Sequence, residues 1–142
     1  MFVYSFDEPA LKATFSVTLL APQHMRALSN MPEVSVARDE ATGWIIHKFD
    51  KSPIMSTYLL AFVIGEFDAI ETRTKRGTIL RCFTPPKKGK LGQFGMEVGR
   101  RALELYEEYF EINYPLPKLD QIAIPDFSAG AMENCKHIQP VM

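Results

Sequence analysis

One acidic side chain, Glu133, lies among small and apolar residues in the stretch SAGAMEN at 128–134. Small side chains let the backbone pass close to a bound molecule. A carboxylate held there would pair with a cation, and a peptide's α-amino group is a cation at neutral pH because its pKa is about 7.7 to 8.0. Pattern alone favours an exposed turn residue, and the small neighbours shift the interpretation toward a binding site.

The three histidines, His24, His47 and His137, show no metal-binding spacing in the sequence, since none belongs to an HExxH pair on one helix face. Structural or exposed roles are expected for them. Cys135 and His137 form a Cys-x-His pair, which is too sparse for a four-ligand zinc site. No Ser-His-Asp or Cys-His set can be assigned either.

Charge and hydropathy exclude several classes of partner. Lys87, Lys88 and Lys90 could contact phosphate, but a solvated linker is favoured because the net charge is −1. That charge gives no reason to expect nucleic acid or an anionic membrane. The longest apolar run, at 58–65, is far below the roughly 20 residues of a membrane span. The start lacks a signal-peptide pattern, and so few cysteines fit a reducing compartment, so a cytoplasmic location is expected.

The first part of the chain, up to Phe83, is predicted to be β-rich. Strand candidates are KATFSVTLL at 12–20, GWIIHKF at 43–49 and STYLLAFVIG at 56–65. The first alternates apolar and polar residues, and the last is apolar enough to predict burial on both faces. Between them APQHMRALSNMPE contains two prolines and predicts a loop. The stretch AIETRTKRGTILRCF predicts a hairpin that turns at Gly77.

In the second part of the chain the spacing of apolar residues changes from that of strands to that of a helix. TPPKKGKLG at 84–92 predicts a linker and a boundary between domains 1–83 and 84–142. A helix is predicted from Gln93 to Glu111, with one apolar face. That face comprises Phe94, Val98, Ala102, Leu105, Tyr106 and Tyr109. Prolines then stop the helix, and DQIAIPDF predicts a short strand that leads into SAGAMEN.

Four segments resemble the gluzincin zinc aminopeptidases of the alanyl and puromycin-sensitive type. They are FDEPALKATF, MSTYLLAFVIGEFD, ALELYEEYFEINYPLPKLDQIAIPDF and GAMEN, in the family's order over residues 5–134. The resemblance implies a mixed α+β fold, with a partial N-terminal β-rich saddle domain at 1–83 and the first part of a thermolysin-like catalytic domain at 84–142. It also implies zinc as the family's cofactor and peptide N-termini as the parent enzyme's substrates.

The resemblance implies a role for GAMEN as well. The family's glutamate binds the substrate's free α-amine and matches Glu133, while Gly130, Ala131, Met132 and Asn134 match the rest of the motif. In relatives, Trp-Gly, an HExxH helix, a third glutamate ligand and an oxyanion-steadying tyrosine follow. Here the sequence instead continues as CKHIQPVM. We therefore expect a fragment or short isoform that binds no zinc and is inactive alone.

Two other functions remain open. One is a non-catalytic interaction protein that pairs with a full-length enzyme, another partner or itself; it requires an exposed apolar face on the helix ALELYEEYF at 102–110. The other, which follows from composition alone, is an unrelated β-rich binding module.

Overall fold

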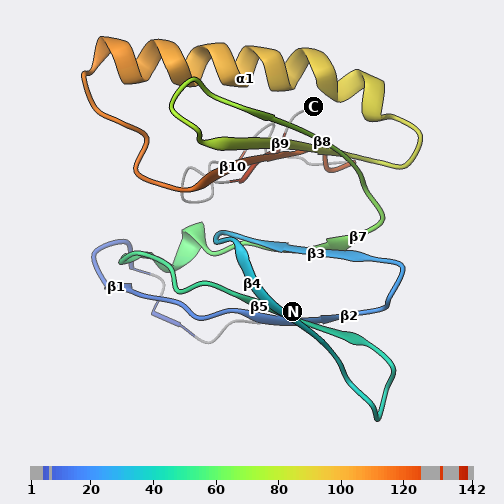
Figure 1. Ribbon diagram of the computed structural model, residues 1–142. Helices are drawn as coiled ribbons and strands as arrows, with labels where there is room; N and C mark the ends of the chain where they lie inside the picture. The colour runs from blue at the N-terminus through green and yellow to red at the C-terminus, as the bar shows by residue number, and fades with distance from the viewer. Residues whose placement is uncertain (1–4, 7, 126–131, 133–137, 141–142) are drawn as a thin grey trace. The chain divides into compact units, whose positions relative to one another are not determined.

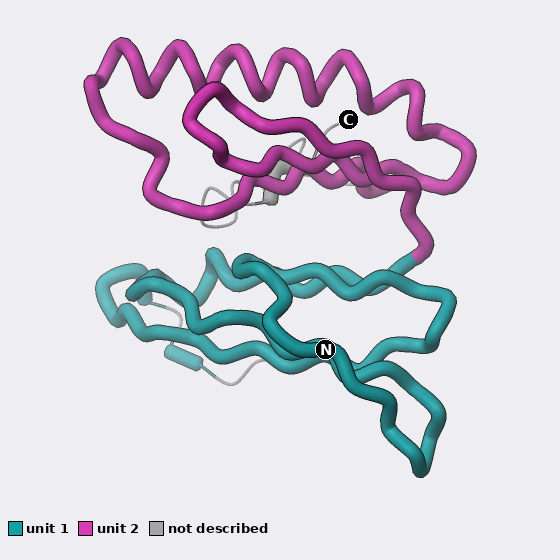
Figure 2. The backbone as a smooth tube through the Cα atoms, in the orientation of Figure 1, with its two compact units in different colours: residues 1–65 teal, residues 66–142 magenta. Residues whose placement is uncertain are grey.

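The computed structural model describes residues 5–6, 8–125, 132 and 138–140 (Figure 1). The chain divides into two compact units, residues 1–65 and 66–142 (Figure 2). The first unit contains only strands and one short 3-10 helix among its described residues, and the second combines strands with a long helix. This content confirms the mixed α+β fold class.

The first unit consists of short antiparallel sheets. Its elements are β1 Lys12–Ala13, β2 Thr18–Ala21, β3 Arg26–Ser29, β4 Glu33–Arg38, β5 Ile45–Phe49, β6 Met55–Ser56, η1 Thr57–Leu59 and β7 Phe62–Gly65. Strands β2, β5 and β4 form one sheet in that order, while β3 pairs with β7 and β1 with β6. All these pairings are antiparallel. Antiparallel sheets can pack one face on the core and expose the other to solvent, so alternate side chains of a strand are buried.

The alternation of burial predicted for 12–20 is confirmed at its end, but this stretch is not one strand, because only its two ends, in β1 and β2, are strands. In β2, Leu19 and Ala21 are buried, while Thr18 and Leu20 point to solvent. The buried pair packs in one cluster with Ala27, Met31 and Phe49.

The side chain of Asn30 fastens the segment between η1 and β7. Its amide nitrogen donates to the Leu59 carbonyl at 2.9 Å, and its amide oxygen accepts from the Ala61 backbone N–H at 2.9 Å. Both groups of this buried amide are therefore satisfied.

Two other predictions for this unit are wrong. The stretch 21–33 is not a loop throughout, because it contains β3 and the start of β4. The stretch 56–65 is not one strand buried on both faces, because η1 interrupts it and β7 pairs only with β3, leaving Ile64 exposed. In both places very short strands pair across the sheet with distant residues, and a local pattern does not report such pairing.

The second unit is built on a four-stranded mixed sheet in the order β11-β10-β9-β8. Its strands are β8 Asp68–Arg73, β9 Ile79–Thr84, β10 Lys118–Ile122 and β11 Ile138–Pro140. β8 and β9 are antiparallel, whereas β10 is parallel to both β9 and β11. The β8–β9 hairpin was predicted, and its turn contains Gly77 at a φ of 89°, a value that favours glycine.

Helix α1, Gly89–Tyr109, makes the crossover between the parallel strands β9 and β10. It begins inside the predicted linker rather than at Gln93, and it packs on β8 and β9 (Figure 1). Glycine is a poor helix former. The sequence pattern therefore predicts a start after Gly92, although the helix begins at Gly89. The chain leaves the helix at Phe110, and Glu111 takes a φ of 54° before the prolines.

The apolar face predicted for this helix is not the face that packs on the sheet. Phe94 is 80% exposed and Tyr109 is 76% exposed. Glycines on the opposite side approach the sheet instead. A Cβ at Gly92 would lie 2.8 Å from Cys82 Sγ, and one at Gly99 would lie 2.4 Å from Gln121 Nε2. The absence of these side chains lets the helix axis lie close to the strands.

The two compact units differ from the predicted domains 1–83 and 84–142. They divide between Gly65 and Glu66, because the β8–β9 hairpin pairs with β10 and carries α1. The domain boundary predicted near Thr84 concerns the family's domains, and it stays a prediction.

Candidate functional site

Strand β10 leads to the GAMEN segment. All five of its residues are buried, and it lies between β9 and β11. Its end is tied to the sheet by a hydrogen bond from the Ala123 N–H to the Phe83 carbonyl at 2.9 Å. In open sheets with parallel strands, ligands bind beyond the carboxyl ends of the strands. The motif follows such an end in the sequence.

Most of the predicted site residues lie outside the described part of the chain. These are Gly130, Ala131, Glu133 and Asn134. Met132 is described and is half-buried. The role of the five residues in holding a peptide amine stays a prediction.

A buried ion cluster on β9 and β10 was missed by the sequence analysis. Asp120, whose side chain is fully buried, accepts two hydrogen bonds from Arg81, Nε to Oδ1 at 2.7 Å and an Nη nitrogen to Oδ2 at 2.6 Å. Lys118 Nζ donates to the same Oδ2 at 2.5 Å. Burial lowers the pKa of Lys118, and Asp120 opposes that shift. The cluster therefore joins two parallel strands just before the motif.

The cluster left one signal in the sequence. Lys118 and Asp120 are two residues apart, so a strand places them on one face. Arg81 pairs directly with Asp120 in the β9–β10 register, and its guanidinium lies 5.2 Å from the Phe83 ring centroid. The sequence alone therefore shows the lysine–aspartate pair but not its arginine partner, because that partner comes from another strand.

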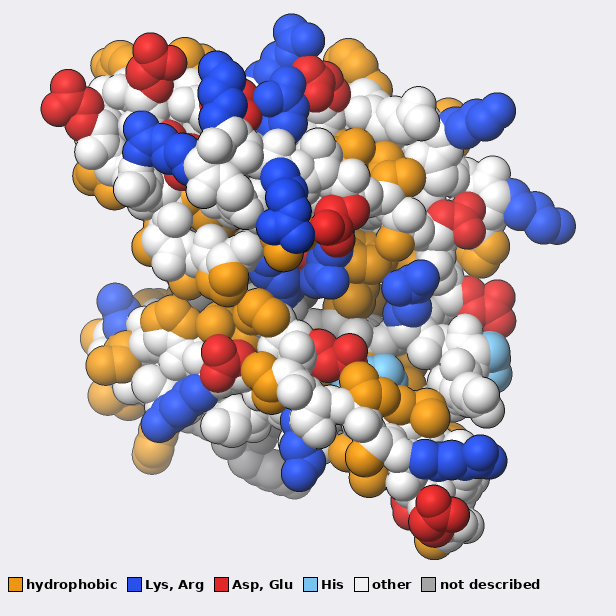
Figure 3. All heavy atoms as spheres, in the orientation of Figure 1, with side chains coloured by type: hydrophobic (Ala, Val, Ile, Leu, Met, Phe, Trp, Pro, Cys, Tyr) orange, Lys and Arg blue, Asp and Glu red, His pale blue; other side chains and the backbone are white. Residues whose placement is uncertain are grey.

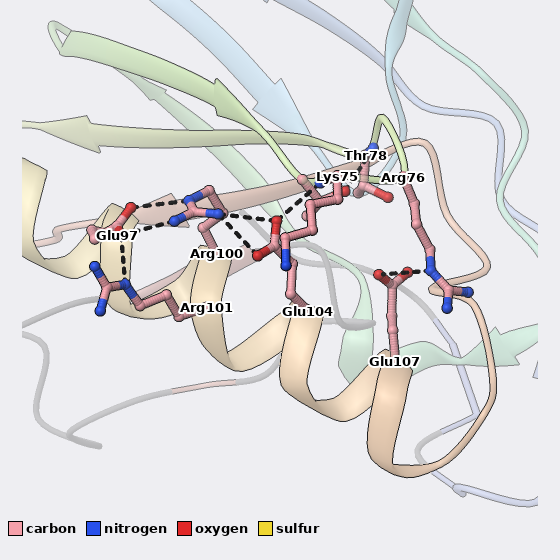
Figure 4. A network of polar contacts seen from close by, with 9 residues as sticks. Lys75, Arg76, Thr78, Glu97, Arg100, Arg101, Glu104 and Glu107 are labelled. Carbon is pink, nitrogen blue, oxygen red and sulfur yellow. Dashed lines mark hydrogen bonds and ion pairs between the residues drawn. The ribbon is translucent and has the colours of Figure 1, made fainter.

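A second network fastens the end of α1 to the β8–β9 turn (Figure 4). Glu107, whose side chain is 4% exposed, accepts from the Tyr114 backbone N–H at 2.7 Å and lies 3.9 Å from Arg76 Nε. Glu104 accepts from the Lys75 backbone N–H at 2.9 Å, which is the main cause of its lowered pKa. This anchoring fixes the helix against the sheet that leads to the motif.

Nearer the start of α1, four charged side chains share one network at the helix surface (Figure 4). Glu97 accepts from Arg100 and Arg101, and these hydrogen bonds lower its pKa to about 2. Arg100 also reaches Glu104, and its pKa is raised by its carboxylate partners, Glu97 most of all. These charges stabilise the helix surface.

The other candidate residues do not come together. His24 lies in a turn and His47 lies in β5, as predicted, with His47 Nδ1 2.5 Å from Glu33 Oε1. Cys135 and His137 fall outside the described residues. Lys87, Lys88 and Lys90 gather at the start of α1, where Lys88 is the N-cap.

Neither a metal site nor a membrane span is found in the described part of the chain. No group of three or more His, Cys, Asp or Glu side chains there could hold a metal ion. These residues therefore do not fit zinc, and the zinc expectation rests on the resemblance alone. No helix in the same part is long and apolar enough to cross a membrane.

Comparisons with known proteins identify the family. The Peptidase M1 N-terminal domain matches residues 1–59, and the Peptidase family M1 domain matches residues 94–139. Aminopeptidase M1 of Arabidopsis thaliana is 49% identical over 130 residues, and Aminopeptidase M1-C of Oryza sativa subsp. japonica is 50% identical over 131 residues. The puromycin-sensitive aminopeptidase of Caenorhabditis elegans is 47% identical over 129 residues.

These alignments cover 91% of this chain and 14% of each of the three relatives. Both family domains match in the order expected from the sequence, and the similar proteins are aminopeptidases. The chain therefore belongs to peptidase family M1.

Proposed function

We propose that this chain is part of a zinc metalloaminopeptidase that removes N-terminal residues from peptides. In this proposal the chain carries the amine-recognition motif but not the hydrolytic machinery. The observation that carries it is the pair of M1 family matches, at 1–59 and 94–139, together with 47% to 50% identity to aminopeptidases. The relatives are much longer, so hydrolysis is proposed for the parent protein and not for these residues alone.

Glu133 would select substrates by their free α-amine. A charge-assisted hydrogen bond contributes about 1.5 to 3 kcal/mol. An acylated or internal peptide would offer no cation, and the carboxylate would remain unpaired. The expected specificity is that of an exopeptidase, with Gly130, Ala131, Met132 and Asn134 shaping the approach of the peptide backbone.

The chain's own residues do not supply a route to hydrolysis. Bound zinc would supply Lewis-acid catalysis and a metal-activated water in the family. The printed sequence contains no HExxH pair, and the described residues hold no triple of metal ligands. We therefore expect no turnover when the purified chain is incubated with zinc and an aminoacyl reporter. Zinc-dependent cleavage that a chelator abolishes would contradict inactivity but leave the family assignment intact.

Amine recognition is tested in a chimera. Residues 5–134 replace the aligned segment of the Caenorhabditis elegans puromycin-sensitive aminopeptidase, which is 47% identical over the matched region. The chimera is expected to cleave peptides with a free amine and to spare acetylated ones. Glu133→Gln should lower kcat/KM about 10- to 150-fold, since 1.5 to 3 kcal/mol is lost.

Glu40→Gln is the matched control, since Glu40 is an exposed glutamate in the turn between β4 and β5. It should leave kcat/KM of the chimera unchanged. Equal losses in the two variants would count against amine recognition by Glu133.

A second candidate function is non-catalytic association through α1. The specific observation in its favour is the exposed apolar face of this helix, on which Phe94, Leu105 and Tyr109 are 80%, 62% and 76% exposed. Hydrophobic side chains lie among the charged ones on the surface of the molecule in Figure 3. Large exposed apolar patches mark interaction sites.

The cytoplasm is the location we propose for either function. The support is the small number of cysteines, two in 142 residues, of which Cys82 is a buried free thiol. Fractionation of cells that express the tagged chain tests this part of the proposal.

A further inference from the structure

The exposed side of α1 carries a continuous apolar row. Its members are Leu91, Phe94, Val98, Leu105 and Tyr109, which are 74%, 80%, 49%, 62% and 76% exposed. Leu91, Val98 and Leu105 recur at the heptad spacing that brings helices together in coiled coils. From Leu91 to Tyr109 the row runs for about 27 Å at 1.5 Å per residue. The sheet-facing glycines lie on the other side of the helix, so this row has no partner among the described residues.

The charges at the two ends of α1 oppose its own dipole. Lys88 and Lys90 stand at its start, where no acidic residue occupies the first turn. The exposed Glu108 stands in its last turn, where there is no basic residue. A helix dipole favours the reverse arrangement. These charges therefore do not serve the isolated helix, whereas a second helix running in the opposite direction would complement them.

One border of the apolar row is complementary to itself. At 100° per residue, Lys90, Glu97, Arg101 and Glu108 follow the same side of the row. If a second copy of the helix runs antiparallel and the two copies cross at Gly99, Lys90 of one copy lies opposite Glu108 of the other. Glu97 then lies opposite Arg101. The side chains of Glu97 and Arg101 are 43% and 75% exposed, so both remain accessible although they pair within the helix.

The same antiparallel arrangement matches the apolar residues. It places Leu91 within two residues of the level of Tyr109, Phe94 within one residue of Leu105 and Val98 within two residues of Ala102, which is at most about 3 Å along the helix axis. When a two-fold axis relates two antiparallel helices, the charged border of one helix lies beside the same border of the other. This is the isologous arrangement of a C2 dimer. Every lysine or arginine of the border then faces a glutamate.

We infer that the exposed face of α1 binds a second copy of this chain, with the two helices antiparallel and centred near Gly99. The inference rests on the second candidate function, and peptide hydrolysis plays no part in it. The two proposals can fail separately, because one is measured by association and the other by turnover.

The test measures sedimentation velocity of the purified full chain at concentrations from about 1 to 200 μM. A weak interface forms a detectable dimer at such concentrations. A reversible dimer is expected. Lys90→Glu and Glu108→Lys should each weaken it about tenfold or more, because each replaces two symmetric attractions by two repulsions. Lys90→Glu also places an acidic residue in the first turn, where the dipole favours it. Loss of the dimer in that variant is therefore not loss of the helix, and circular dichroism checks this.

Mixing the two variants gives the decisive result. In a heterodimer, the introduced glutamate of one copy would face the introduced lysine of the other, and the remaining Lys90 would face the remaining Glu108. Differently tagged variants should therefore associate with each other about as tightly as the unmodified chain does, and each more tightly than with itself. A nonspecific hydrophobic aggregate would not show this pattern.

Three outcomes overturn the inference. The first is a chain that stays monomeric over the whole range. The second is a dimer that neither charge reversal weakens, or a mixture that forms no preferred heterodimer. The third is a monomeric chain that instead binds a full-length M1 aminopeptidase through the same face.

Discussion

At the scale of single residues, the strongest interactions surround Asp120. This fully buried carboxylate is held by Arg81 and Lys118, which come from two parallel strands. Buried charges persist only when they are paired and hydrogen-bonded. The three side chains therefore fix the register of β9 and β10, and with it the point at which the chain leaves the sheet toward GAMEN.

Asp120→Asn should destabilise the fold by about 3 to 5 kcal/mol, because it removes the buried negative charge that accepts hydrogen bonds from both Arg81 and Lys118. The measurement is urea unfolding followed by circular dichroism. Glu71→Gln is the control: Glu71 lies 3.8 Å from Arg73 and both side chains are half exposed or more. Its effect should stay within about 0.5 kcal/mol. Similar small changes in both variants would show that the buried cluster contributes no more than a surface pair.

Glu97 gives a prediction about pH. Hydrogen bonds from Arg100 and Arg101 lower its pKa to about 2 in the folded chain, against an ordinary value of 4.5. The unfolded chain therefore binds more protons between these values, and the stabilisation by Glu97 is complete above about pH 4.5 and lost as the pH falls toward 2.

The variant Glu97→Gln should consequently have a lower Tm than the unmodified chain at pH 7, and the difference should close as the pH approaches 2. Thermal melts at several pH values measure it. High salt should shrink the difference at pH 7, since the network is exposed. A Tm difference that persists unchanged at the acid end of this range would show that Glu97 acts through packing and not through its charge.

The letters of GAMEN locate the candidate site in the sequence, whereas the Arg81–Asp120 pair could not be predicted from it. Those two residues are 39 positions apart and meet only because β9 and β10 are parallel neighbours. A motif identifies residues that act within one short segment. Contacts between distant segments depend on strand order, which no local pattern contains.

At the scale of elements, α1 shows what hydrophobic periodicity reports and what it leaves out. The spacing predicted both a helix and one apolar face, and the helix is confirmed. The periodicity could not say that glycines would face the sheet, nor that the helix begins at Gly89. Glycine lowers helix propensity, so a local pattern excludes it, and its advantage appears only when a strand lies against it.

Gly92→Ala tests that advantage. The added methyl would lie 2.8 Å from Cys82 Sγ and 3.1 Å from Thr84 Cγ2, both on a buried strand. We expect a net loss of about 1 to 3 kcal/mol from overpacking, even though alanine improves helix propensity by about 1 kcal/mol. Gln93→Ala, at the exposed neighbouring position, should be neutral or slightly stabilising. A Gly92→Ala chain that is more stable in urea than the unmodified one would mean that the helix can move away from the sheet without cost.

At the scale of the whole molecule, the chain combines two compact units, and each has its own sheets. The M1 family matches fall on 1–59 and 94–139, so the β8–β9 hairpin lies between them in the sequence while it packs with the second unit. Because the helix packs on this hairpin through glycines, its apolar row is left to solvent. The exposed row is thus a consequence of how the second unit is built.

Self-association through this row predicts a concentration-dependent Tm. A partner that binds the folded chain and not the unfolded one stabilises the fold by mass action, so the Tm should rise by a few degrees between about 2 and 200 μM. Phe94→Glu should abolish the rise, because it places a charge on the most exposed member of the apolar row. Ile54→Glu is the matched control, since Ile54 is 70% exposed but belongs to the first unit. It should leave the rise intact, and a Tm that responds equally to both variants would indicate general hydrophobic aggregation instead of pairing through α1.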